Sequence, residues 1–143
     1  MENIFLEKAI DIIKTTDSVF AYVSEEETLR SCAKGIGFAA MLCNEKKDLS
    51  QGAVADKVVG KAAALLFVYL GVKVVYAETL SMGAKAVFEK YGINYSYANL
   101  TEYIINRKGD GLCPMELAVR NVDTPEMALV EVTKTLEELR KKA

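Results

Sequence analysis

The chain has 143 residues, a formal net charge of −2 from 18 basic and 20 acidic side chains, and no histidine. This length fits one domain spanning residues 1–143, with a core that buries roughly two-thirds of the unfolded surface. The absence of histidine excludes Ser-His-Asp triads, Cys-His dyads and the usual histidine-containing zinc sites. The three cysteines are scattered, without a CxxC pair, so we expect neither zinc nor another metal cofactor.

The distribution of charge and of apolar residues excludes two further classes of partner. Lysine and arginine are dispersed along the chain, which argues against binding nucleic acid through its phosphates. The longest uncharged run, 62–72, is too short to cross a bilayer. No signal-peptide pattern is present, and the odd number of cysteines fits reduced thiols. We therefore expect a cytoplasmic protein with no membrane partner.

The first third of the chain predicts a helix, a β-hairpin and a second helix. Apolar residues recur at helical spacing over 4–14. The segments 18–23 and 28–33 flank a charged turn and predict the two strands of a hairpin. An apolar patch at 38–43 predicts the next helix.

The stretch 52–83 predicts a β-α-β unit around which the domain is organised. A short apolar run leads into a predicted helix over 56–70, which Gly71 ends, and 72–78 predicts a strand. From residue 58 to residue 70 the only charge is Lys61. A helix that is apolar nearly all round is expected to be buried.

The remainder predicts a helix, a short strand, an irregular loop and two further helices. The helix is expected at 82–91, the strand at 94–98 and the loop at 99–112. The two further helices are expected to start at Pro114 and to span 125–140. Gly92 is expected to close the first of these helices, and Thr124 to cap the last. Strands that alternate with helices predict an α/β fold with three α/β/α layers and a mixed, mainly parallel sheet.

Two sequence stretches carry a resemblance to a known family. The element order, with GAVADKVVGKAAALL at 52–66 and INRKGDGLCPME at 105–116, resembles a prokaryotic family of unknown function with a cytidine deaminase-like fold. The resemblance covers about residues 1 to 122 and implies a fold but no activity. Zinc deaminases of this fold carry His-x-Glu at the start of the buried helix and Pro-Cys-x-x-Cys at the start of the next. Neither motif stands at the corresponding positions, near 56–58 and 80–84, which excludes zinc-dependent deamination.

Three charged residues gather at the start of the predicted buried helix. Lys57 and Lys61 would lie one turn apart on one helix face, where their repulsion and the helix dipole are both unfavourable. An anionic ligand such as a phosphate would relieve both. In the alternative interpretation, Asp56 caps the helix and the two lysines extend to solvent.

Other candidates come from the later loops. Cys113 precedes Pro114 at a helix start, where the dipole can lower a thiol pKa and favour a nucleophile, although a small buried cysteine fits equally. Arg107, beside a Gly-Asp-Gly turn, suits a phosphate or ribose, although turn chemistry alone explains the glycines. Ser81 is expected to open the helix at 82–91, near the start of the predicted buried helix. The tyrosines between 91 and 103 could stack a base, although a strand whose tyrosines pack against neighbouring residues or a second subunit explains them as well.

We therefore expect a metal-free, non-deaminating protein that binds a nucleotide or another phosphorylated small molecule. The expected ligand-binding residues are Asp56, Lys57, Lys61, Ser81, Arg107 and Cys113. One alternative is a metal-independent enzyme that uses Cys113 or a pocket lysine on a nucleotide-like substrate, for example one resembling ADP-ribose. Another is a structural dimerising module. Whichever of these functions holds, we expect the chain to associate into a homo-oligomer, with a preference for a dimer.

Overall fold

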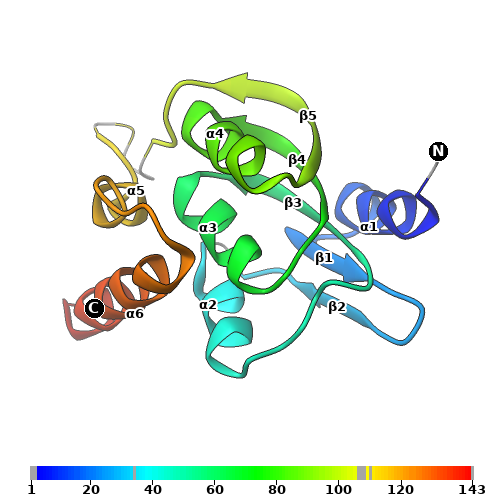
Figure 1. Ribbon diagram of the computed structural model, residues 1–143, viewed down its shortest axis with the longest axis horizontal. Helices are drawn as coiled ribbons and strands as arrows, with labels where there is room; N and C mark the ends of the chain where they lie inside the picture. The colour runs from blue at the N-terminus through cyan, green and yellow to red at the C-terminus, as the bar shows by residue number, and fades with distance from the viewer. Residues whose placement is uncertain (1–2, 34, 106–108, 110, 143) are drawn as a thin grey trace.

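A computed structural model describes residues 3–33, 35–105, 109 and 111–142. Its strands form one five-stranded sheet in the order β2-β1-β3-β4-β5, with helices on both faces (Figure 1). The elements are α1 (Ile4–Thr15), β1 (Phe20–Val23), β2 (Thr28–Ser31), α2 (Gly37–Asn44), β3 (Ala53–Val59), α3 (Lys61–Tyr69), β4 (Val74–Ser81), α4 (Met82–Tyr91), β5 (Asn94–Thr101), α5 (Pro114–Ala118) and α6 (Pro125–Lys142). The predicted three-layer α/β/α fold and the predicted order of elements are confirmed.

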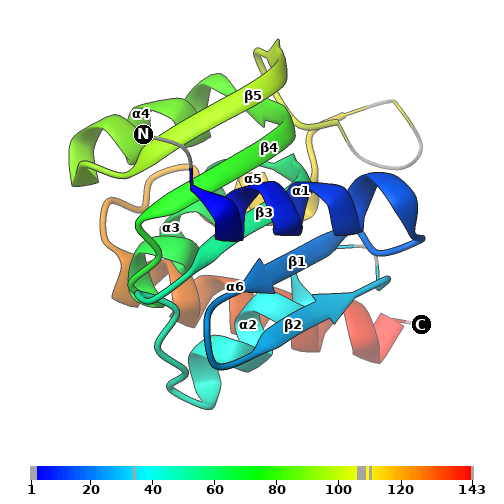
Figure 2. The ribbon, with the colours of Figure 1, turned by 90° about the vertical axis from the view of Figure 1, so that its right-hand side faces the viewer.

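The sheet is mixed, with a parallel centre as predicted. β1 pairs antiparallel with β2 and with β3, whereas β3–β4 and β4–β5 are parallel. The two parallel pairs are each connected by a helix, α3 and α4, on the same side of the sheet. Figure 2 shows α1 crossing the opposite side, where Ala9 and Ile13 pack on Ala21 and Ala55.

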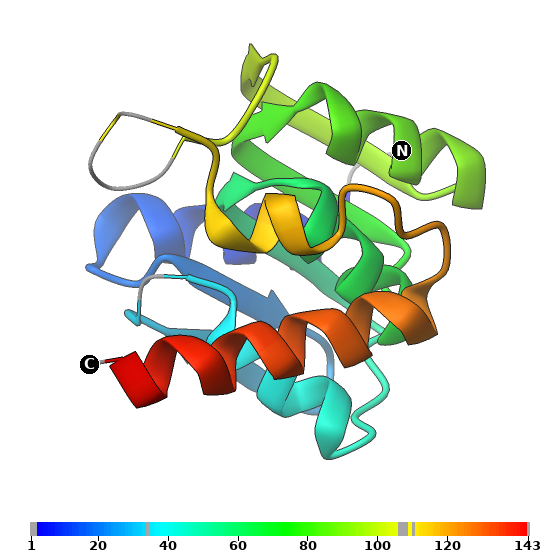
Figure 3. The same cartoon turned by 90° about the vertical axis from the view of Figure 1, so that its left-hand side faces the viewer.

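Helix α3 is the centre of the larger core. Ala62, Ala64, Leu65, Leu66 and Phe67 are all buried. The sheet covers one side of α3, and α2, α4, α5 and α6 contact the rest of it. Figure 3 shows α5 and α6 on the outer side of this helix layer, where Ala128 and Val132 of α6 join the core. An almost uncharged helix is stable here because nearly every one of its faces has an apolar neighbour.

Three predicted helix ends are confirmed. The Ser81 hydroxyl accepts a hydrogen bond from the amide of Ala84 at the start of α4, at 3.0 Å. Gly92 ends α4 with φ at 70°, a conformation that glycine adopts without strain. Thr124 Oγ1 accepts a bond from the amide of Met127 at the start of α6.

The predicted helix over 56–70 is wrong at its beginning. Asp56 and Lys57 belong to β3, and α3 begins at Lys61. β3 is held between β1 and β4, with Asp56 opposite Phe20 on one side and Ala77 on the other, so both of its edges are paired. Asp56 therefore does not cap a helix, and the two lysines do not lie one turn apart on a helix face.

No helix in the described part of the chain is long and apolar enough to cross a membrane.

Candidate functional site

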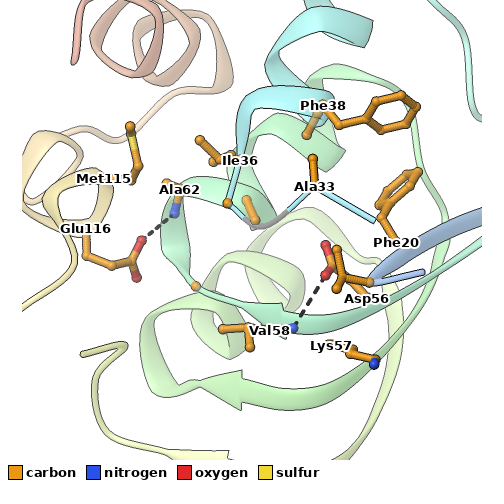
Figure 4. Close-up of a pocket in the computed structure, with 15 residues that line it drawn as sticks. Phe20, Ala33, Ile36, Phe38, Asp56, Lys57, Val58, Ala62, Met115 and Glu116 are labelled. Carbon is orange, nitrogen blue, oxygen red and sulfur yellow. Dashed lines mark hydrogen bonds between the residues drawn. The ribbon is translucent and has the colours of Figure 1, made fainter. Parts of the chain in front are cut away.

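A cavity of about 390 Å³ opens beside the carboxyl end of β3 (Figure 4). β1, the segment before α2, and the starts of α3 and α5 form its walls. The walls are mostly apolar, and the principal apolar side chains are Phe20, Ile36, Phe38, Ala62 and Met115. The rings of Phe20 and Phe38 lie 5.4 Å apart at 59°. Ligands of open α/β sheets bind outside the carboxyl ends of strands, so this is the position expected for a ligand site.

Asp56 is one of two acidic residues that line this cavity, the other being Glu116. Its side chain points toward the cavity, and its Oδ1 accepts a long hydrogen bond of 3.4 Å from the amide of Val58. Burial raises the pKa of Asp56 to about 7, against the opposing effect of the amides of Val58 and Lys57. In the described residues, no cation forms an ion pair with this carboxyl. Near neutral pH the site therefore holds both the acid and the carboxylate.

Glu116, from α5, occupies the start of α3. Its Oε1 accepts a hydrogen bond from the amide of Lys61 at 2.8 Å, and its Oε2 accepts one from the amide of Ala62 at 3.0 Å. These amides are among those that a helix leaves unpaired at its N-terminus, where the dipole also favours negative charge. Glu116 thus caps a helix whose N-cap residue, Gly60, has no side chain to do so.

Gly60 makes this contact possible. A Cβ at position 60 would lie 2.4 Å from Glu116 Oε1, well inside van der Waals contact. The φ of Gly60 is −100°, which other residues adopt without strain. Space for the carboxylate, rather than backbone conformation, therefore requires glycine at this position.

The structure divides the predicted site residues between two places. Asp56 and Lys57 belong to the cavity wall, but as neighbours on a strand they leave it on opposite sides. Lys61 and Ser81 line a separate groove of about 670 Å³, and Glu116 borders both spaces. Lys61 Nζ donates a hydrogen bond to the carbonyl of Arg120 at 3.3 Å.

The other two predicted residues lie elsewhere. Cys113 precedes α5 and packs, partly buried, against the core; it lines neither the cavity nor the groove. Arg107 lies outside the described residues. Whether any of the six residues binds a ligand stays a prediction.

The structure does not contain the arrangement from which an anion site was predicted at the start of the buried helix. Lys57 and Lys61 stand on different elements, and the helix amides that would bind a phosphate already bind Glu116. A phosphate at this place would have to displace an internal carboxylate.

The aromatic wall and the capping role of Glu116 were not predicted from the sequence. Phe20 and Phe38 lie in separate elements that only the folded sheet brings together. Glu116 binds amides 54 and 55 residues before it, a distance at which no local pattern applies. The available signal was Gly60, which follows the β-branched pair Val58–Val59 and precedes Lys61 and the apolar run 62–72. A glycine at such a place indicates the end of a strand and the start of a helix.

The fold and cavity define a three-layer α/β domain with a small-molecule-sized space at the carboxyl end of a parallel strand. Residues 8–136 match the family described as TM1506, a domain of unknown function (DUF1893), and the chain belongs to this family. Its structure is similar to the crystal structure of a DUF1893 family protein, TM1506, from Thermotoga maritima. The TM-score is 0.85 at 26% identity, over 94% of this chain and 91% of that one. A search of curated proteins finds no match. The expected membership of a family of unknown function is confirmed.

Replacing Glu116 is expected to destabilise the protein by uncapping α3. We expect Glu116→Ala to lower the free energy of unfolding by about 1.5–3 kcal/mol, because two charge-assisted hydrogen bonds are lost. Urea denaturation measures this change. The control is Glu126→Ala in the exposed first turn of α6, which should change stability by less than about 0.5 kcal/mol.

A double-mutant cycle tests whether Gly60 serves Glu116. Gly60→Ala should destabilise the wild-type protein by displacing the Glu116 carboxylate. In the Glu116→Ala background the same change should be nearly neutral, because the φ at position 60 suits alanine. Equal effects of Gly60→Ala in the two backgrounds would show that the two residues do not interact.

Asp56 is expected to make stability fall as pH rises. The pKa in the folded protein, about 7, lies above that of an unfolded aspartate, so the stabilisation is complete below about pH 4 and is lost as pH rises toward 7. Asp56→Asn should be more stable than wild type at pH 8, and this advantage should shrink by pH 4. Urea denaturation at pH 4, 6 and 8 measures the difference.

Asp48 provides a control of opposite sign for this pH series. Hydrogen bonds from the side chain and amide of Ser50 lower the pKa of Asp48. The difference between Asp48→Asn and wild type should therefore change only in the acid range, as pH falls below about 4. A constant difference between Asp56→Asn and wild type from pH 4 to pH 8 would contradict the assignment of a raised pKa to Asp56.

Proposed function

We propose that this protein binds a nucleotide or a similar heterocyclic, phosphorylated small molecule in the Asp56 cavity, without metal and without deaminating it. The observation that carries this proposal is a cavity of about 390 Å³ at the carboxyl end of β3, with an aromatic wall and the carboxyl group of Asp56 beside it. Ligand pockets typically have volumes of about 300–1,000 Å³, with apolar walls and a few polar groups that orient the ligand.

The walls suggest how such a ligand is oriented. A heterocycle packs against Phe20 and Phe38, and a ring N–H donates a hydrogen bond to Asp56. Lys57 leaves β3 on the side opposite to Asp56, so its positive charge serves only a phosphate that extends beyond the rim of the cavity and around the end of the strand. Lys61 and Ser81 line the neighbouring groove. They contact the ligand only if it extends beyond Glu116 into that groove.

The relation to cytidine deaminase-like domains belongs to this proposal. The order of helices and strands supports it, but the residues at the start of α3 do not fit a zinc ion. In place of a His-x-Glu motif, the chain has Gly60 and a carboxylate that already binds two amides. No cluster of three or more histidine, cysteine or acidic residues able to hold a metal occurs in the described segments. We therefore propose a metal-free binding protein. We further propose that it acts in the cytoplasm, where its three free cysteines stay reduced.

A thermal-melting panel tests the proposed ligand class. At least one nucleotide or sugar phosphate should raise the melting temperature of the wild-type protein. Lys57→Ala should weaken binding of that ligand about 10- to 100-fold, because a charge-assisted hydrogen bond is lost. The matched control is Lys73→Ala, an exposed lysine that lines neither the cavity nor the groove. If no panel member raises the melting temperature, or if the two lysine variants respond alike, the proposed ligand class is wrong.

Strand β5 favours a second role, self-association. It is an edge strand of eight residues, Asn94–Thr101, without charge or proline, and most of its side chains are exposed. Edge strands of monomeric proteins are usually protected by charges, proline or bulges. Antiparallel pairing of β5 with β5 of a second copy would continue the sheet across a two-fold axis. For the enzyme alternative, Cys113 offers no comparable observation, since it lines neither space.

Light scattering tests the homodimer. The expected mass is twice the 15.7 kDa of one chain at micromolar concentration. Tyr97→Lys should shift the protein toward the monomer, because pairing would bring like charges together, whereas Tyr103→Lys, at an exposed position beyond the strand, should not. A monomeric wild-type protein would contradict the proposed dimer.

A further inference from the structure

The carboxyl group of Asp56, on a partly exposed residue, has few partners within the protein. The structure gives it one long hydrogen bond, 3.4 Å from the amide of Val58. Around it, β1 and the segment leading into α2 contribute Phe20, Ile36 and Phe38, none of which can neutralise a charge. Apolar neighbours disfavour the charged form of a carboxyl group, and a cation beside the group stabilises that form.

The other charged groups facing the cavity do not provide that cation. In the described part of the wall they are Lys57 and Glu116. Lys57 leaves β3 on the side opposite to Asp56 (Figure 4). The Glu116 carboxylate already accepts bonds from the amides of Lys61 and Ala62. The described wall residues from α2 and α3 are uncharged, so no side chain in the described part of the wall offers Asp56 a cation, and a cationic ligand would supply one.

We infer that the Asp56 cavity selects planar aromatic compounds that carry an amidine-like edge, two parallel N–H donors on a cationic or protonatable group. This inference rests on the proposed function, namely that the cavity binds a small molecule. Two parallel N–H donors match the two oxygens of a carboxylate, as in arginine–carboxylate pairs. The ring attached to them packs against Phe20 and Phe38, whose tilted rings form an aromatic wall.

Charge, and not shape alone, decides the selection. An amidinium neutralises the Asp56 carboxylate within an apolar space, where the interaction is stronger than in water. A neutral amide of the same shape offers the N–H donors of one nitrogen and no charge. The preference should therefore grow with ionisation of Asp56 as pH rises through about 7.

The test compares benzamidine, which stays cationic, with benzamide, its neutral analogue, by NMR titration of the full-length protein at pH 6 and pH 8. We expect benzamidine to bind wild type at least tenfold more tightly than benzamide at pH 8. This preference should fall about tenfold at pH 6, because the ionised fraction of a group with a pKa of about 7 falls by that factor. Asp56→Asn should remove the preference, and Asp48→Asn, at an exposed aspartate, should retain it.

A second variant separates the ring contact from the charge. Phe38→Leu should weaken the binding of both compounds by a similar factor and leave their ratio unchanged. Equal affinities for the two compounds in wild type, or a preference that survives Asp56→Asn, would overturn the inference while leaving a small-molecule cavity in place. If neither these compounds nor the nucleotides bind, the proposed function fails with it.

Discussion

The contact between the Glu116 carboxylate and the first amides of α3 joins the two parts of the structure on which the candidate site depends. It caps the central, nearly uncharged helix, which has no capping side chain of its own at Gly60. It also fixes α5 against that helix, so that Met115 and Glu116 complete one wall of the cavity. Lys61 strengthens the same junction by donating to the carbonyl of Arg120. Without this contact, the first amides of α3 would lack a protein acceptor.

Two carboxyl groups near one helix start therefore have different roles, set by their surroundings. Glu116 accepts two amide hydrogen bonds, at 2.8 and 3.0 Å, which hold it at the start of α3. Asp56 receives one long bond among apolar side chains, which disfavour the charged form and raise its pKa to about 7. Glu116 is thus structural, while Asp56 retains the capacity to exchange a proton or to pair with a cation. This difference directs the search for a ligand to the cavity and away from the helix terminus.

The fold was largely predictable because its signals are local. The alternating helices and strands, the buried helix, and the caps at Ser81, Gly92 and Thr124 all follow from short patterns, and each is found in the structure. The boundary at Asp56 was not predictable in this way, because pairing of β3 with β1 and β4 overrides the helical interpretation of its charged residues. The cavity wall depends on Phe20, Phe38 and Glu116, which come from three distant elements. Patterns within the sequence identified Asp56 as a candidate but gave it the wrong local structure.

The most direct test of this account is the side-chain carboxyl carbon signal of Asp56, followed by NMR through a pH titration of the free protein and of the protein with benzamidine. The account predicts a midpoint near 7 in the free protein, because burial disfavours the carboxylate. It predicts a lower midpoint with benzamidine, because the bound cation stabilises the carboxylate. A midpoint near 4, the ordinary value for aspartate, with no response to benzamidine would contradict it.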